Sequence, residues 1–126
     1  MPRRIDPATG RAAVERAALL WEAADASDPD ATATATAVRF LLQELGDRAP
    51  GRSVEVRVPP FGAAQCMEGT SHRRGTPPAV IETDARTWIS LCLGTVTWAD
   101  AVAQGRVQAS GERADLSLVV PLVTWE

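Results

Sequence analysis

The sequence predicts an α+β fold, because stretches with helical spacing of apolar residues are followed by stretches in which apolar and polar residues alternate. Helical spacing occupies most of residues 7–49 and returns over residues 85–104, whereas residues 53–83 and 106–111 show a period of two. A chain of 126 residues has the usual length of one domain and can bury a single core. We therefore expect a single domain over residues 1–126.

The first two elements are predicted to be helices. Asp6 is a candidate N-cap, Pro7 suits the first helical position, and one face then carries Val14, Ala17, Ala18 and Trp21. The second helix runs from about Thr32 to Ala49, where Pro50-Gly51 ends it. Its apolar residues at helical spacing are Val38, Leu41, Leu42 and Leu45.

The middle of the chain is predicted to form strands. Residues 53–58 place Val54, Val56 and Val58 on one face, and the Pro-Pro-Phe-Gly turn that follows leads into a returning strand over residues 63–69. Residues 79–84 predict a third strand after a loop over residues 70–78. We expect these three strands to form a meander.

The last third returns to helices. Asp84 can cap a helix over residues 85–93 that Gly94 ends, and Thr97 can cap a shorter helix that runs to Gln104. Residues 106–111 then predict a strand with Val107 and Ala109 facing inward. A short final helix over residues 112–121 and an apolar tail of Leu122, Val123 and Trp125 complete the expected order.

Composition excludes several function classes. The net charge of −3 comes from interspersed charges of both signs, which gives no broad basic surface for nucleic acid. The basic N-terminus lacks the apolar run of a signal peptide or a transmembrane span, so we expect a cytoplasmic protein. Cys66 and Cys92 are predicted to be free thiols, because a domain of this size needs no disulfide.

The segment Gln65–Gly75, QCMEGTSHRRG, contains the types of residue used in catalysis and metal binding. A nucleophilic cysteine needs a base nearby and a lowered pKa, and Cys66 is predicted to lie late in a strand, away from a helix N-terminus. Zinc needs three or four ligands, whereas Cys66, Glu68 and His72 show no recurrent spacing. Glu82 and Asp84 are better explained by the cap than by paired-acid catalysis. We predict no catalytic residue, metal or cofactor, and therefore no enzyme.

The loop SHRRG has two interpretations. His72, Arg73 and Arg74 are typical of a solvated surface loop. They could also contact an anionic head group, since arginine offers two parallel hydrogen bonds to a carboxylate or a phosphate.

The C-terminal part of the chain resembles a known family. The stretch TDARTWISLCLGTVTWADAVAQGRVQASGERADLS, with RSVEVRVPPFGAAQCMEG and HRRGTPPAVIETD before it, is similar to sterol carrier protein 2-like domains of the small bacterial, actinobacterial type. The residues on that pattern are Asp84, Leu91, Gly94, Ala101, Gly105, Val107, Ser110 and Gly111. The similarity covers roughly residues 30–122.

The resemblance implies a small, mainly antiparallel sheet of four to five strands covered on one face by helices, with a helix from residues 1–29 packed on it. It also implies a lipid-binding or carrier function for a fatty acid, acyl-CoA or other lipid, held in an apolar cavity between sheet and helices. The cavity residues would be Val56, Val58, Trp88, Leu91, Leu116 and Val119. His72, Arg73 and Arg74 would lie near the head group. The alternative is an interaction or dimerisation module without ligand, and a homodimer stays open.

Overall fold

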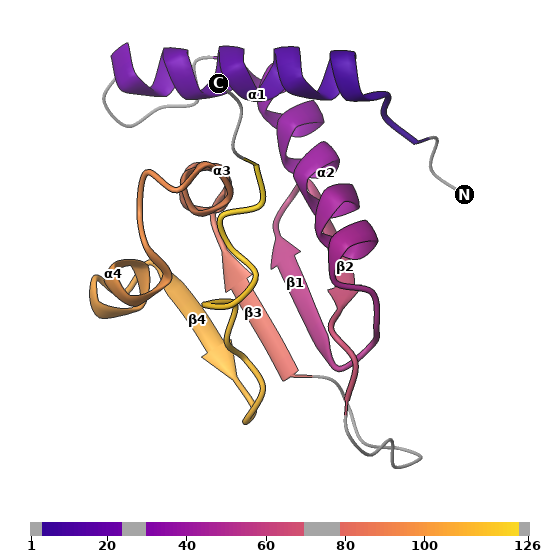
Figure 1. Cartoon of the computed structure of the whole chain (residues 1–126). Helices are drawn as coiled ribbons and strands as arrows, with labels where there is room; N and C mark the ends of the chain where they lie inside the picture. The colour runs from indigo at the N-terminus through magenta and orange to yellow at the C-terminus, as the bar shows by residue number, and fades with distance from the viewer. Residues whose placement is uncertain (1–3, 24–29, 70–78, 124–126) are drawn as a thin grey trace.

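The computed structural model describes residues 4–23, 30–69 and 79–123, and these ranges contain the elements of an α+β fold, as predicted (Figure 1). The helices are α1 (Pro7–Ala23), α2 (Ala31–Arg48), α3 (Ala85–Leu93) and α4 (Trp98–Ala103). The strands are β1 (Val54–Val58), β2 (Gly62–Cys66), β3 (Ala79–Thr83) and β4 (Val107–Ser110).

Local capping explains where three of the helices begin. The side chains of Asp30, Asp84 and Thr97 each accept a hydrogen bond from the backbone N–H three residues later, at 2.8 to 3.0 Å. Gly94 ends α3 in the left-handed conformation, with a φ of 82°. The caps at Asp84 and Thr97 are those predicted, and α2 begins one residue before the expected Thr32.

The strands form one sheet in the order β2-β1-β3-β4, and the predicted meander is wrong. β1 pairs antiparallel with β2, but β3 lies on the other side of β1 and runs parallel to it, with Val56 opposite Ile81. β4 then adds antiparallel to β3. Two of the three pairings are thus antiparallel, and the connection between β2 and β3 crosses from one edge strand past β1.

Within the described part of the chain, one face of the sheet is covered and the other is open. α2, α3 and the chain after β4 lie over the covered face, and α1 lies across α2 (Figure 1). Side chains alternate accordingly, since Val56 and Ile81 are buried whereas their neighbours Arg57 and Glu82 face away from the core. Of the two residues of the last strand predicted to face inward, Val107 is half-buried but Ala109 is exposed, because β4 is an edge strand.

The chain after β4 does not form the predicted final helix. Residues 111–123 run as turns and extended backbone, and Asp115 accepts a hydrogen bond from the Ser117 N–H at 2.8 Å, which favours a turn. The apolar tail is confirmed for Leu122 and Val123, which are buried, while Trp125 lies outside the described residues. We call residues 112–123 the C-terminal segment.

Helix α1 packs closely on α2 through a glycine. A Cβ atom at Gly10 would lie 2.2 Å from ring carbons of Phe40, so only glycine allows this approach. At the start of α1, the Gln43 carboxamide of α2 donates to the carbonyl of Ile5 and accepts from its N–H, both at 2.9 Å. The predicted apolar face of α1 is buried at Val14, Ala17 and Trp21.

Candidate functional sites

The structure brings most of the predicted cavity residues into one apolar cluster. Val56 and Val58 of β1 and Trp88 of α3 belong to this core cluster, as does Leu116 of the C-terminal segment, and Val119 packs against it from the surface. Leu91 is equally buried but lies outside the cluster. The covered face of the sheet, α3 and the C-terminal segment therefore meet at these residues.

Trp88 joins two helices at the centre of this cluster. Its side chain is fully buried, and its indole N–H donates to the carbonyl of Val38 in α2 at 3.4 Å. A buried indole needs such a partner for its N–H, and this one holds α3 against α2 above the sheet.

The cluster is closed around its members. Val56, Val58, Trp88 and Leu116 have no accessible surface, so no space large enough for a water molecule adjoins them. Close packing of this kind is normal for protein interiors. An acyl chain can enter this layer only if one of the surrounding elements moves.

The C-terminal segment covers the sheet without forming a helix or a strand itself. The carbonyl of Cys92 accepts from the N–H groups of Leu122 at 2.9 Å and Val123 at 3.2 Å, and Arg48 donates to the carbonyl of Leu122. No strand pairing attaches these residues to β4. Arg113 also donates to the carbonyl of Glu68 at 3.4 Å, and Leu116, Leu122 and Val123 add apolar contacts with the core.

The residues predicted for head-group contact, His72, Arg73 and Arg74, lie outside the described residues.

Both cysteines are free, as predicted, and both are buried. Burial raises the pKa of the Cys66 thiol to about 11 and raises that of Cys92 well above its ordinary value. A buried thiol with a raised pKa holds little thiolate at neutral pH, and the thiolate is the reactive form. These surroundings suit small buried apolar residues rather than nucleophiles.

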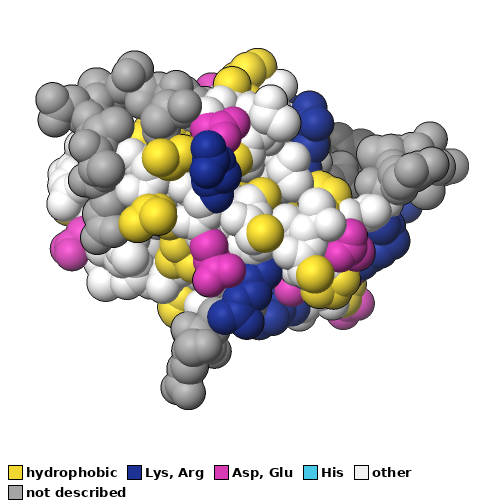
Figure 2. Space-filling view, turned by 90° about the horizontal axis from the view of Figure 1, so that it is seen from above, with side chains coloured by type: hydrophobic (Ala, Val, Ile, Leu, Met, Phe, Trp, Pro, Cys, Tyr) yellow, Lys and Arg dark blue, Asp and Glu magenta, His cyan; other side chains and the backbone are white. Residues whose placement is uncertain are grey.

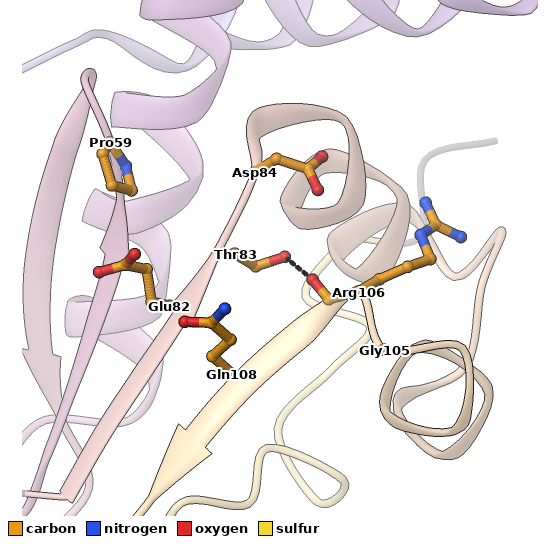
Figure 3. Close-up of a pocket in the computed structure, with 7 residues that line it drawn as sticks. All are labelled: Pro59, Glu82, Thr83, Asp84, Gly105, Arg106 and Gln108. Carbon is orange, nitrogen blue, oxygen red and sulfur yellow. Dashed lines mark hydrogen bonds between the residues drawn. The ribbon is translucent and has the colours of Figure 1, made fainter. Parts of the chain in front are cut away.

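A polar pocket opens at the ends of β1 and β3, and sequence reasoning missed it. It has a volume of about 480 Å³ and is lined by Pro59, Glu82, Thr83, Asp84, Gly105, Arg106 and Gln108 (Figure 3). Glu82 and Gln108 are opposite each other on β3 and β4, so both side chains lie on the open face. In the sequence, Glu82 and Gln108 stand out only as polar positions in two strands of alternating polarity. The sequence does not show that these two strands pair, so it does not bring the two residues together.

Internal hydrogen bonds occupy several of the polar groups around this pocket. Asp84 accepts from both the N–H and the hydroxyl of Thr87, at 2.8 and 2.9 Å, so the predicted cap accounts for its carboxylate. Thr83 donates through its hydroxyl to the carbonyl of Arg106 at 2.8 Å, which fixes the start of β4 (Figure 3). The Arg106 side chain runs away from Glu82 and Gln108 toward Thr87, to which its Nε–H donates at 3.1 Å.

The described part of the chain offers neither a metal cluster nor a membrane span. No group of three or more histidine, cysteine or acidic side chains there could hold a metal ion. Among residues 4–23, 30–69 and 79–123, no helix combines the length and apolar character needed to cross a membrane.

Comparison with known proteins places the chain in a family. The family described as bacterial SCP ortholog, where SCP stands for sterol carrier protein, matches residues 30–122, from the cap of α2 to the C-terminal segment. Because this match covers most of the chain, the chain belongs to the bacterial sterol carrier protein family. Helix α1 lies before the matched region. The comparison with curated proteins finds no match.

Proposed function

We propose that this member of the bacterial sterol carrier protein family is a non-enzymatic lipid carrier that holds an acyl chain between its sheet and its helices. The observation that carries the proposal is the apolar cluster on the covered face of the sheet, which includes Val56, Val58 and Trp88. Burial of each methylene contributes about 0.8 kcal/mol, so such a layer can supply the affinity for a chain without polar contacts.

Entry of the acyl chain into this layer requires the C-terminal segment to move. This segment is non-helical, forms no strand pairing with β4, and contributes the buried side chain of Leu116 to the apolar layer. Displacing it would expose the cluster from one side while α2, α3 and the sheet stay paired. The ligand then replaces apolar contacts that the segment makes in the closed state.

A charged head group would remain near water at the mouth of this layer. We propose His72, Arg73 and Arg74 as its contacts, because fatty acids and acyl-CoA are anionic and arginine pairs well with carboxylates and phosphates. Exposed ion pairs contribute only about 0–1 kcal/mol each, so these residues would orient the lipid more than bind it.

Paired leucine substitutions test the proposal. Leu116 has no accessible surface, whereas Leu118, two residues later in the same segment, is 97 % exposed. Leu116→Ala should loosen the cover and leave space in the layer, so we expect a fluorescent fatty acid to bind about tenfold more tightly, a change of about 1.4 kcal/mol. Leu118→Ala should leave the affinity within about twofold of the wild type.

The control for folding is the near-ultraviolet circular dichroism spectrum, which should be native in both variants. Native mass spectrometry of freshly purified protein supplies an independent readout, since a carrier should retain a copurified lipid. Equal affinity of all three proteins for the fatty acid, or no saturable binding by any of them, would contradict an acyl site in this layer.

The second candidate is an interaction or dimerisation module without ligand. The closed packing around Val56 and Trp88, together with the exposure of Leu118, favours it. The face seen from above in Figure 2 is a less suitable interaction surface. Its described apolar side chains are interspersed with acidic and basic ones and do not form one continuous apolar patch. Sedimentation of wild type and Leu118→Arg distinguishes the two candidates, since a dimer formed through Leu118 would dissociate in the variant.

A further inference from the structure

We propose that the polar pocket at the ends of β1, β3 and β4 binds a small organic cation, a guanidinium or primary ammonium group, through Glu82 and Gln108 (Figure 3). Both residues lie on the open face of the sheet, and the apolar cluster lies on the covered face. The proposal is therefore independent of the lipid function.

Glu82 is the acceptor that makes the pocket attractive to a cation. Its side chain is half-buried, and among the described residues its carboxylate makes no hydrogen bond or ion pair. A partly desolvated carboxylate gains more from a charged partner than a fully hydrated one does.

The two arginines nearest to Glu82 in the sheet are engaged elsewhere. Arg57 is opposite Glu82 on β1, but its Nε–H donates to Glu55 on the same strand. Arg106, at the start of β4, donates to Thr87 at 3.1 Å and to Gln104 at 3.3 Å. Among the described residues, no arginine therefore forms an ion pair with Glu82.

The position of the pocket in the sheet is also typical of a ligand site. β1 and β3 are parallel neighbours, and Pro59 and Asp84 follow directly after their carboxyl ends. Ligands of sheets with parallel strands commonly bind outside these ends. A volume of about 480 Å³ falls within the usual range for small molecules and is far larger than a single metal ion requires.

The side chains suggest how a guanidinium would bind. Its planar N–H groups can donate two parallel hydrogen bonds to the Glu82 carboxylate, and a third can reach the carboxamide oxygen of Gln108 on the neighbouring strand. Pro59 offers an apolar surface to the carbon part of the ligand. Asp84 adds negative charge nearby while its oxygens remain bonded to Thr87.

Methylguanidinium is the probe for this site, and N-methylurea is its neutral analogue of nearly the same shape. In two-dimensional amide spectra of the whole chain, methylguanidinium should shift the signals of Glu82, Gly105 and Gln108 in a saturable way. Glu82→Gln removes the charge and keeps the shape, so it should weaken binding about tenfold, equivalent to about 1.4 kcal/mol. Glu15→Gln on α1, which removes the same charge away from the pocket, should leave binding unchanged.

Three results would overturn the proposal. Shifts of the same signals by N-methylurea as large as those by methylguanidinium would exclude charge recognition. Glu82→Gln could bind as well as Glu15→Gln does, which would exclude Glu82 as the partner. The shifts could also increase without saturation, which would indicate weak contact with the whole surface. Since Glu82 lies on the open face, loss of this site leaves fatty-acid binding to the covered face testable by itself.

Discussion

At the scale of the residue, burial decides what the two cysteines do. Cys66 and Cys92 lie in the core cluster, where the charged thiolate form is disfavoured and the pKa of both thiols is raised. The residue types that would suit catalysis are present in the sequence, but the structure surrounds these two with apolar side chains. Because their pKa values are raised, the free energy of unfolding should vary with pH in the alkaline range.

We predict that the free energy of unfolding falls as the pH rises from about 8.5, where an unfolded thiol titrates, toward 11. In this window the unfolded thiol has lost its proton while the folded one keeps it, so deprotonation favours the unfolded state. Each thiol contributes a slope of at most about 1.4 kcal/mol per pH unit. The chain has no tyrosine and no lysine, so few other side chains titrate there.

Urea unfolding at closely spaced pH values measures this slope, and Cys66→Ala should make it shallower. The cavity left by the substitution lowers stability equally at every pH, so it does not affect the comparison. An identical slope in wild type and variant would show that Cys66 does not contribute.

At the scale of the element, what could be predicted depended on whether the cause was local. Asp84 and Gly94 define α3 to the residue, because a cap and a left-handed glycine act within a few positions of the chain. The position of β3 next to β1 was missed, since the residues of all three strands fit a meander equally well and only tertiary packing selects the partner. The pocket at Glu82 and Gln108 was missed for the same reason.

The final helix was wrong for a different reason. Its apolar residues have approximate helical spacing, but the Asp115 side chain accepts a hydrogen bond from the Ser117 N–H, which favours a turn in place of a helix. In this turn Leu116 packs into the core, while Leu118 is almost fully exposed. The cavity itself stays a prediction. Five of the six proposed cavity residues are buried, because apolar residues of a predicted strand or helix face are buried whatever their partners turn out to be.

The packing of α1 on α2 predicts that an alanine in place of a helix glycine lowers stability, whereas helix propensity alone predicts that it raises stability. Alanine is more favourable than glycine in a helix interior by about 1 kcal/mol. At Gly10, however, the added methyl would lie 2.2 Å from the Phe40 ring, so we expect Gly10→Ala to lower the free energy of unfolding by about 1–3 kcal/mol.

Gly46→Ala in α2 is the matched control for that experiment. Its nearest neighbour would be the carbonyl oxygen of Gln65 at 4.0 Å, an ordinary contact. This variant should be neutral or more stable by up to about 1 kcal/mol in the same urea titration. If both variants were stabilised, the close approach of the two helices would not exist in solution.

At the scale of the whole molecule, the question is whether α1 is part of the same folding unit as the matched region. The family match begins at residue 30, yet Val14, Ala17 and Trp21 of α1 are buried against the remainder of the core. Complete burial of a large apolar side chain contributes about 1.5–3 kcal/mol, so Val14 and Trp21 together supply a large share of the 5–15 kcal/mol typical of a domain.

We therefore predict that α1 and the sheet unfold in one cooperative transition. Native-state hydrogen exchange followed by mass spectrometry should give peptides from the centre of α1 the same opening free energy as peptides from β1, with the same dependence on urea concentration. The physical reason is that undocking α1 exposes Phe40, which packs on Gly10, and removes the covering of Val14 from the common core. The control is Arg4→Ala, which removes the exposed ion pair with Asp47 and should leave the exchange of α1 nearly unchanged. Exchange of α1 at a much lower free energy than β1 would instead identify it as a separately docked helix on a domain that begins near residue 30.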